Sequence, residues 1–231
     1  MSFPYFNHFL ELFYPRLCLA CTDAVPPKSE LFCLQCQFKL PKTNLHLTKE
    51  NALTERFWGR LPLVSGAALY YFIKGGRTQQ LIHNLKYTGK RQIGLEVGKW
   101  YAEELKEVAW FQSVDLIVPV PLHPKKERLR GYNQSDYFAQ GLSEGLKRPT
   151  LKTGLKRLSF TSTQTKKSKL DRFENVLRAF AVSNPEHLKG KHILLVDDVI
   201  TTGATLEACG LRILEVPDTK LSILSIALAD H

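Results

Sequence analysis

One segment constrains the fold of this chain more than any other. Residues 193–205 read Ile-Leu-Leu-Val-Asp-Asp-Val-Ile-Thr-Thr-Gly-Ala-Thr. Four branched apolar residues precede two adjacent carboxylates, and a loop of small residues follows before a helical pattern begins at Leu206. A continuous branched apolar run predicts a strand buried on both faces, as in a parallel sheet covered by helices. The segment therefore predicts an α/β fold.

The same segment predicts a ligand site. In open α/β sheets, ligands bind beyond the carboxyl ends of the strands, which is where Asp197 and Asp198 fall. Ionised carboxylates only accept hydrogen bonds, and this suits a vicinal diol or a bound cation. The small loop lets N–H groups and hydroxyls face a phosphate at the start of a helix. A ribose 5-phosphate meets both requirements, with phosphate contacts from Thr201, Thr202, Gly203, Ala204 and Thr205.

Other proteins also end a buried strand with carboxylates. Walker B segments do so, but they work with a Walker A loop, and no G-x-x-x-x-G-K-[ST] sequence occurs in this chain. No G-x-G-x-x-G sequence occurs either, so a dinucleotide site has no support. An acid pair that merely ends an ordinary buried strand, as in phosphoacceptor domains, stays open as the alternative.

Four of the five cysteines lie near the N-terminus in the pattern C-x2-C-x11-C-x2-C: Cys18, Cys21, Cys33 and Cys36. Two C-x2-C pairs can complete a tetrahedral four-cysteine site for Zn²⁺. Disulfide bonds are the alternative, and a cytoplasmic location disfavours them. We therefore expect a structural zinc site, which can stabilise a segment too small to bury its own core. The fifth cysteine, Cys209, is expected to be a small buried apolar residue.

The positive charge of the chain is concentrated in two segments. The net charge is +10, and residues 121–131 and 147–178 carry surpluses of 3 and 8 positive charges. Such local charge favours a polyanionic ligand over a solvated basic face without a partner. No apolar run approaches the roughly 20 residues of a membrane helix, and the N-terminus lacks the basic start of a signal peptide. These features predict a cytoplasmic protein without membrane insertion.

Strands alternate with helices along the chain, which predicts a mostly parallel sheet. The expected strands are residues 63–72, 115–120, 193–196 and 221–229, and the expected helices are residues 79–87, 94–108, 134–146 and 206–215. Residues 42–55 are polar and are expected to be a linker. Residues 147–169 have few large apolar side chains and are expected to form a mobile basic loop with a short strand inside it.

A strand end followed by a basic turn is expected at residues 118–134. Four cations there can neutralise a diphosphate, Arg through a planar fork and Lys as a point charge: Lys125, Lys126, Arg128 and Arg130. His123 is either a proton carrier or, as is commoner for a lone histidine in a Pro-rich turn, structural. Tyr132, Tyr137 and Phe160 lie among the basic segments, where they can either stack on nucleic-acid bases or pack in the core.

These motifs resemble those of type I phosphoribosyltransferases, whose ligand is 5-phosphoribosyl 1-pyrophosphate (PRPP). Residues 193–205 resemble the PRPP signature, in which the acids hold the ribose hydroxyls and the loop holds the 5-phosphate. The basic turn resembles the pyrophosphate loop. A third set resembles the flexible loop with which amidophosphoribosyltransferases cover PRPP: Arg157, Thr161, Gln164, Lys166, Lys167 and Arg172.

With the cysteines and the motif Leu85-Lys-Tyr-x-Gly89, the chain resembles the ComF family of competence-associated proteins over nearly its whole length. The resemblance implies a type I phosphoribosyltransferase-like domain at residues 61–231, with a mostly parallel sheet flanked by helices. A small four-cysteine zinc-binding module and linker are expected at residues 1–60. It also implies binding of PRPP with Mg²⁺, and handling of incoming single-stranded DNA together with other competence proteins.

The reaction, if any, stays open at this stage. The chain is expected to transfer phosphoribosyl groups to a nitrogen nucleophile, to act as an inactive PRPP-sensing DNA-binding module, or to serve nucleotide metabolism with an unknown acceptor. No general base is identified. The early cysteines are all assigned to the metal, so a glutamine amidohydrolase nucleophile is not expected.

Overall fold

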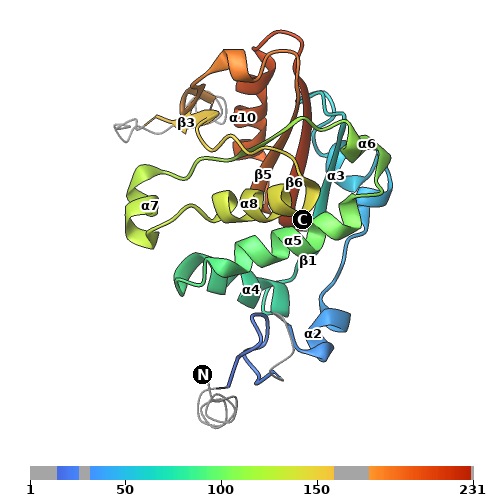
Figure 1. Cartoon of the computed structure of the whole chain (residues 1–231), viewed down its shortest axis with the longest axis vertical. Coiled ribbons are helices and arrows are strands. Elements are labelled where there is room, and N and C mark those ends of the chain that lie inside the picture. The colour runs from blue at the N-terminus through green and yellow to red at the C-terminus, as the bar shows by residue number, and fades with distance from the viewer. Residues whose placement is uncertain (1–14, 26–31, 159–176, 230–231) are drawn as a thin grey trace, which may run out of the picture.

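The computed structural model of the chain describes residues 15–25, 32–158 and 177–229. Four strands form the main sheet in the order β1 (Ser65–Phe72), β6 (Lys220–Ala229), β5 (His192–Ile200) and β2 (Leu116–Pro119). Every pairing in it is parallel. Parallel neighbours require crossover connections, and these contain α4 (Arg77–Tyr87), α5 (Gln92–Leu105), α8 (Gln134–Leu146) and α10 (Ala204–Leu214), as Figure 1 shows. The predicted mostly parallel sheet flanked by helices is confirmed.

Helices cover the sheet on both faces. Along β5, Leu194 and Val196 belong to a buried cluster with side chains of α4, α5 and α8. Ile193 and Leu195 belong to a second cluster with α10 and the short helix α3 (Ala52–Glu55). Successive strand residues point to opposite faces of the sheet. An apolar residue at each of these four positions therefore fits a strand whose two faces are both covered. This arrangement accounts for the uninterrupted apolar run in the sequence.

The polar segment for which we expected a linker is folded against the sheet. Residues 42–55 contain the 3-10 helix η1 (Leu45–Leu47) and helix α3. Asn51 caps α3 by accepting from the N–H groups of Leu53 and Thr54 at 2.9 and 3.2 Å, and its amide donates to the Gly66 carbonyl of β1 at 2.9 Å. Leu53 is completely buried. The polar side chains thus satisfy backbone groups of an ordered segment rather than solvate a loose one.

The other described elements are short. They are α2 (Leu34–Lys39), α6 (Ala109–Gln112), α7 (Pro124–Arg130), η2 (Pro185–His187) and an antiparallel pair of strands, β3 (Leu155–Arg157) and β4 (Phe180–Val182). The eight elements expected from the sequence begin within two residues of the expected positions. None of the described helices has the length and apolar character to cross a bilayer. Cys209 is fully buried, as expected.

Candidate functional site

A cleft of about 530 Å³ opens at the end of β5 that carries the acid pair. Its wall is assembled from α4, from the segment between β2 and α8 with the start of α8, from β5, and from the loop before α10. The last residues of β1 and β3 complete it. Both carboxylates line it, together with cations from three separate parts of the chain. The charged lining residues are Asp197, Asp198, Lys86, Lys126, Arg130 and Arg157. The fold therefore brings the acid pair together with members of both predicted cationic segments.

The two carboxylates have different partners. Asp197 accepts from the Ser135 hydroxyl at 2.9 Å and from the Asp198 N–H at 2.8 Å. Burial, together with the adjacent Asp198 carboxylate, raises the pKa of Asp197 to about 7. The other carboxylate, Asp198, is 4% exposed, and its Oδ1 lies 2.8 Å from Lys86 Nζ. Its Oδ2 has no hydrogen-bond partner among the described residues. A buried carboxylate oxygen without a donor fits a ligand hydroxyl or a cation.

The small-residue loop adjoins the acid pair. Thr201 and Thr205 reach the main cleft. All five residues from 201 to 205 line a smaller hollow of about 40 Å³ beside it. Gly203 has φ of 79° and stands at the N-cap of α10, a backbone conformation that glycine adopts without steric cost. Thr202 accepts from the Ala204 N–H at 3.4 Å. The loop and the first turn of α10 thus enclose this hollow, and phosphate binding there stays a prediction.

Residues that follow α3 support this loop from behind. The Phe57 ring packs on Gly203 so closely that a Cβ on Gly203 would lie 2.7 Å from Phe57 Cζ. Arg60 pairs with Glu207, in the first turn of α10, at 2.7 Å, and Glu207 is 5% exposed. The sequence motifs did not indicate either contact, because nothing in the local pattern relates residues 57–60 to residues 203–207.

The predicted basic turn is instead the helix α7, with Pro124 in its first turn and Gly131 in the left-handed conformation at its end. Of its four cations, Lys126 and Arg130 line the cleft, and Lys125 and Arg128 are not part of the lining. Prolines restrict the backbone before them but are well suited to a first helical turn. The three prolines of the segment therefore mark the start of a helix as well as the end of a strand.

His123 caps α7, and its ring accepts from the Lys125 N–H at 3.1 Å. This contact favours the structural interpretation of His123 over that of a proton carrier. Tyr132 is also structural. It is 8% exposed and its hydroxyl donates to the Leu85 carbonyl, so it is not available to stack on a base. Tyr137 is half-buried beneath the Arg91 guanidinium, 5.6 Å from the ring centroid.

One member of the predicted flexible loop can be located. Arg157 is the last residue of β3, lines the cleft, and lies 5.0 Å from the centroid of the Phe180 ring. Phe160 lies outside the described residues. So do the other flexible-loop candidates, which are Thr161, Gln164, Lys166, Lys167 and Arg172.

The structure also adds residues to which the sequence assigned no role. Lys86 and Ser135 contact the acid pair, and Tyr87 lies beside Arg130, with its ring centroid 5.1 Å from the guanidinium. Lys86 and Tyr87 belong to the motif Leu85-Lys-Tyr-x-Gly89, which was the only sequence signal for them. Helical periodicity shows which face of α4 is apolar, but it does not show which strand a polar side chain reaches.

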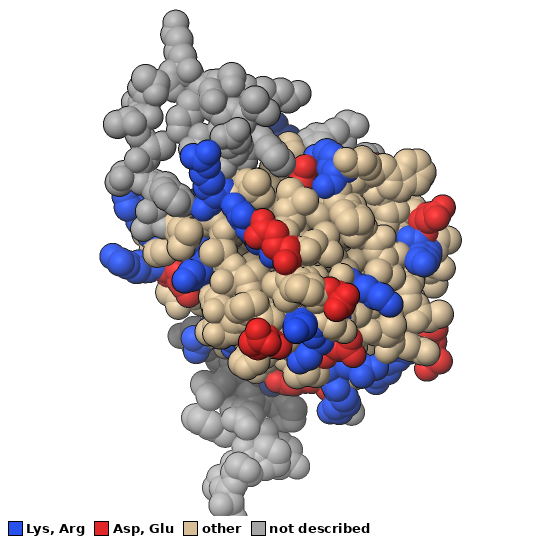
Figure 2. Space-filling model, turned by 90° about the horizontal axis from the view of Figure 1, so that it is seen from above, with Lys and Arg blue, Asp and Glu red and all other residues tan. Residues whose placement is uncertain are grey.

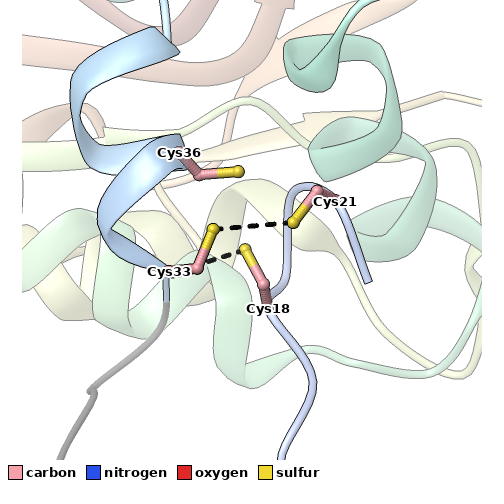
Figure 3. A group of neighbouring side chains, drawn as sticks. All are labelled: Cys18, Cys21, Cys33 and Cys36. Atoms are coloured by element: carbon pink, nitrogen blue, oxygen red, sulfur yellow. Dashed lines mark hydrogen bonds between the residues drawn. The ribbon is translucent and has the colours of Figure 1, made fainter. Parts of the chain in front are cut away.

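The four cysteines near the N-terminus form a candidate metal site. Their sulfur atoms lie within 4.8 Å of one another and point toward a common centre, as Figure 3 shows. Four sulfurs bound to one zinc at about 2.3 Å are about 3.8 Å apart, which the cluster approaches, with Cys21 Sγ 3.6 Å from Cys33 Sγ. All four thiols are free. Thiolate donors suit a zinc ion, and a closed set of four fits a structural site.

The cysteine module is packed against the larger domain. Cys18, Cys36 and Phe32 share a buried cluster with α4 and α5. The Phe32 ring lies 5.9 Å from that of Trp100, and the Asn84 side chain donates to the Leu19 carbonyl at 3.0 Å. The module therefore extends the core beneath the same helix, α4, that carries Lys86 into the cleft (Figure 1).

A family model agrees with the architecture of the sheet and its helices. The family model of the phosphoribosyl transferase domain matches residues 135–230, which contain α8, β5, the small loop and β6. Among solved structures, glutamine PRPP amidotransferase from B. subtilis aligns at 21% identity with a TM-score of 0.42, over 58% of this chain and 26% of that one. The parallel sheet, its helical layers and the domain match define a protein with a type I phosphoribosyltransferase-like domain behind a four-cysteine module.

Relatives specify the family further. DNA utilization protein YhgH of Escherichia coli (strain K12) is 32% identical over 201 residues, which cover 85% of this chain and 83% of the relative. Competence protein F of Haemophilus influenzae is 42% identical over 93 residues, 40% of this chain and 41% of that protein. Competence protein ComFC of Bacillus subtilis is 32% identical over 100 residues, 43% and 38% of the two chains. The chain belongs to the ComF family of competence-associated proteins.

Proposed function

We propose that the cleft binds PRPP. The observation that carries the proposal is the meeting, in one cleft, of an acid pair, a small-residue loop at a helix N-terminus and four cationic side chains. The ribose hydroxyls would donate to Asp197 and Asp198, and the 5-phosphate would accept from the loop of residues 201–205. The diphosphate would lie against Lys126, Arg130 and Arg157, as charge-assisted hydrogen bonds favour.

Two metal ions belong to this proposal. Mg²⁺ prefers oxygen ligands and is usually held by one or two carboxylates together with substrate phosphates. The unpartnered Oδ2 of Asp198 and the diphosphate of the ligand provide such oxygens. Zn²⁺ would be held by the four cysteines, where it stabilises the N-terminal module. The proposed boundary between the zinc module with its adjoining segment and the phosphoribosyltransferase-like domain lies near residue 60.

Isothermal titration with PRPP, with and without Mg²⁺, tests this function. Saturable binding that requires the acid pair supports it, and the variant for the test is Asp197→Asn with Asp198→Asn. Glu103→Gln serves as the control, because Glu103 is an exposed acid on α5 outside the cleft. Absence of saturable binding by the unmodified protein with Mg²⁺ present would refute the proposal, as would full affinity in the double variant.

Binding of PRPP is compatible with transfer of its phosphoribosyl group to an acceptor. If the protein is an enzyme, diphosphate leaves the ribose C1 and a nitrogen nucleophile takes its place, with the cations of the cleft stabilising the departing diphosphate. The acceptor is not identified by the described residues. Release of pyrophosphate from PRPP in the presence of candidate amines, ammonia or nucleobases separates an enzyme from a protein that only senses PRPP.

A second candidate function is binding of single-stranded DNA, in the cytoplasm and together with other competence proteins. The observation that favours it is α7, which has no buried residue and carries Lys125 and Arg128 outside the cleft, beside Leu129 at 87% exposure. Exposed cations suit the phosphates of a nucleic-acid strand. The names of the relatives, which refer to DNA utilization and competence, point the same way.

The test is DNA affinity as a function of salt. Contacts to phosphates predict an affinity that falls steeply with salt concentration, and Lys125→Gln with Arg128→Gln should weaken it. On the face drawn in Figure 2, Lys and Arg side chains are interspersed with Asp and Glu, so the described residues there offer no continuous basic surface. Lys106→Gln, which removes a cation outside the cleft and outside α7, provides the control. Affinity that is independent of salt, or of the α7 cations, would refute this function.

A further inference from the structure

Lys86 occupies a position where two proposed parts of the ligand would meet. It lies in the last turn of α4, lines the cleft, and places Nζ 2.8 Å from Asp198 Oδ1. Its side chain is 20% exposed and that of Asp198 is 5% exposed. The backbone at this end of α4 is tied down, because the Tyr132 hydroxyl donates to the Leu85 carbonyl. Lys86 is therefore a long, flexible side chain on a fixed support.

The ammonium of Lys86 and a sugar diol would both bind the carboxylate of Asp198. Asp198 is held on a central strand of the sheet, so it cannot withdraw from the cleft. Its Oδ1 is taken by Lys86, and its Oδ2 has no partner among the described residues. Ribose hydroxyls that donate to Asp198 stabilise its negative charge and so replace part of the contribution of the Lys86 ammonium. A Lys side chain can then turn to another anion, because its four-carbon stem carries three rotatable donors.

The cations of α7 that line the cleft offer a place for a second anion. Arg130 contacts the ring of Tyr87, the residue that follows Lys86, at 5.1 Å from its centroid. Arg130 also donates to Gln134 Oε1 at 3.0 Å, which fixes the guanidinium at the wall of the cleft. A diphosphate held by Arg130 and Lys126 would therefore lie next to the end of α4, within the same cleft as the Lys86 ammonium.

From this geometry we propose that Lys86 makes the cleft selective for a sugar phosphate that carries a diphosphate. Without ligand, Lys86 neutralises Asp198. With ligand, the ribose hydroxyls take over Asp198 and the ammonium binds the diphosphate. A sugar phosphate without the diphosphate offers the ammonium no new anion, so Lys86 stays on Asp198 Oδ1 while a ribose hydroxyl donates to Oδ2. The inference rests on the proposed binding of PRPP, and it assigns to Lys86 a role in specificity rather than in holding the sugar.

The test compares two ligands, PRPP and ribose 5-phosphate, by isothermal titration with Mg²⁺ present. Loss of one charge-assisted contact predicts that Lys86→Met weakens PRPP binding about tenfold or more. Ribose 5-phosphate binding should change by less than about threefold, since that ligand gains no contact with the ammonium. Lys86→Arg, which keeps a cation, should recover most of the preference for PRPP. Lys106→Met, a charge change at the residue that follows α5, outside the cleft, should leave both affinities unchanged.

The readout is the ratio of the two dissociation constants. An equal loss for both ligands would overturn the inference, because it would mean that Lys86 serves only as the partner of Asp198. An unchanged ratio in a folded Lys86→Met protein would overturn it too. If Lys86→Met does not fold with its buried carboxylate unpaired, the double variant Lys86→Met with Asp198→Asn is compared with Asp198→Asn alone, and the ratio of the two dissociation constants decides. An unmodified protein that binds neither ligand would instead refute the proposed function.

Discussion

We expect Gly203→Ala to destabilise the protein through two separable effects. The first is backbone strain, because Gly203 has φ of 79° and an alanine would have to adopt the same left-handed conformation. The second is steric, because the new Cβ would lie 2.7 Å from Phe57 Cζ and 3.0 Å from Cε1. Phe57 is 1% exposed and belongs to the cluster beneath α10, so its ring has little room to move.

The magnitudes follow from the two effects. A non-glycine residue in the left-handed conformation costs about 1 to 2 kcal/mol, and an overpacked methyl group costs about 1 to 3 kcal/mol. Their sum is a loss of about 2 to 5 kcal/mol in the free energy of unfolding. In a chain of this size, that loss corresponds to a melting temperature lower by about 4 to 20 °C.

Gly190→Ala is the matched control. Gly190 has φ of 70°, and a Cβ there would meet nothing within 4 Å, so this variant isolates the backbone effect. Thermal unfolding followed by circular dichroism, with urea titration, gives both losses. A double-mutant cycle of Gly203→Ala with Phe57→Leu isolates the steric effect, because a smaller side chain frees space behind the loop.

The reasoning would be refuted if Gly203→Ala cost no more than Gly190→Ala, or if the cycle showed no coupling between positions 203 and 57. Either result would mean that the loop is not supported by Phe57. If the coupling is present, the same variant should also weaken binding of ribose 5-phosphate, since the shifted loop carries the proposed phosphate contacts.

Three further outcomes are expected. Asp197→Asn should raise the melting temperature more at pH 8 than at pH 5. The folded protein retains the Asp197 proton up to about pH 7, while the unfolded chain loses it near pH 4. The wild-type protein therefore loses stability as pH rises between these values. An equal gain in melting temperature at pH 5 and pH 8 would contradict this. Arg60→Met should lower the melting temperature more than Glu207→Gln, because only the former leaves a buried carboxylate unpaired, and the reverse order would contradict it. Removal of the metal by a chelator, or Cys36→Ser, should lower the melting temperature and eliminate bound zinc, as measured by elemental analysis; full stability without metal would refute a structural zinc site.

Local patterns in the sequence were sufficient for the main elements. The apolar run before Asp197 predicted a buried parallel strand, because a strand covered on both faces can contain no exposed positions. The cysteine spacing predicted the cluster, since C-x2-C pairs place two sulfurs on one turn. The expected basic turn of residues 118–134 contains the helix α7 instead, because Pro124 suits the first turn of a helix.

The linker expectation for residues 42–55 failed for a related reason. Polar composition is typical of loops, but Asn51 uses its polar groups to cap α3 and to bind the backbone of β1. Composition reports the polarity of a side chain and not the partner that satisfies it. Only the fold decides whether that partner is water or a neighbouring strand.

The sequence by itself determined the α/β class, the acid pair, the small-residue loop and the four-cysteine cluster, because each depends on neighbours along the chain. Tertiary structure alone decided the rest of the cleft. It selected Lys126 and Arg130 from the four cations of α7, paired Lys86 with Asp198, and placed Phe57 behind Gly203. These contacts join residues far apart in sequence, and their geometry arises only when helices from both faces pack on one sheet.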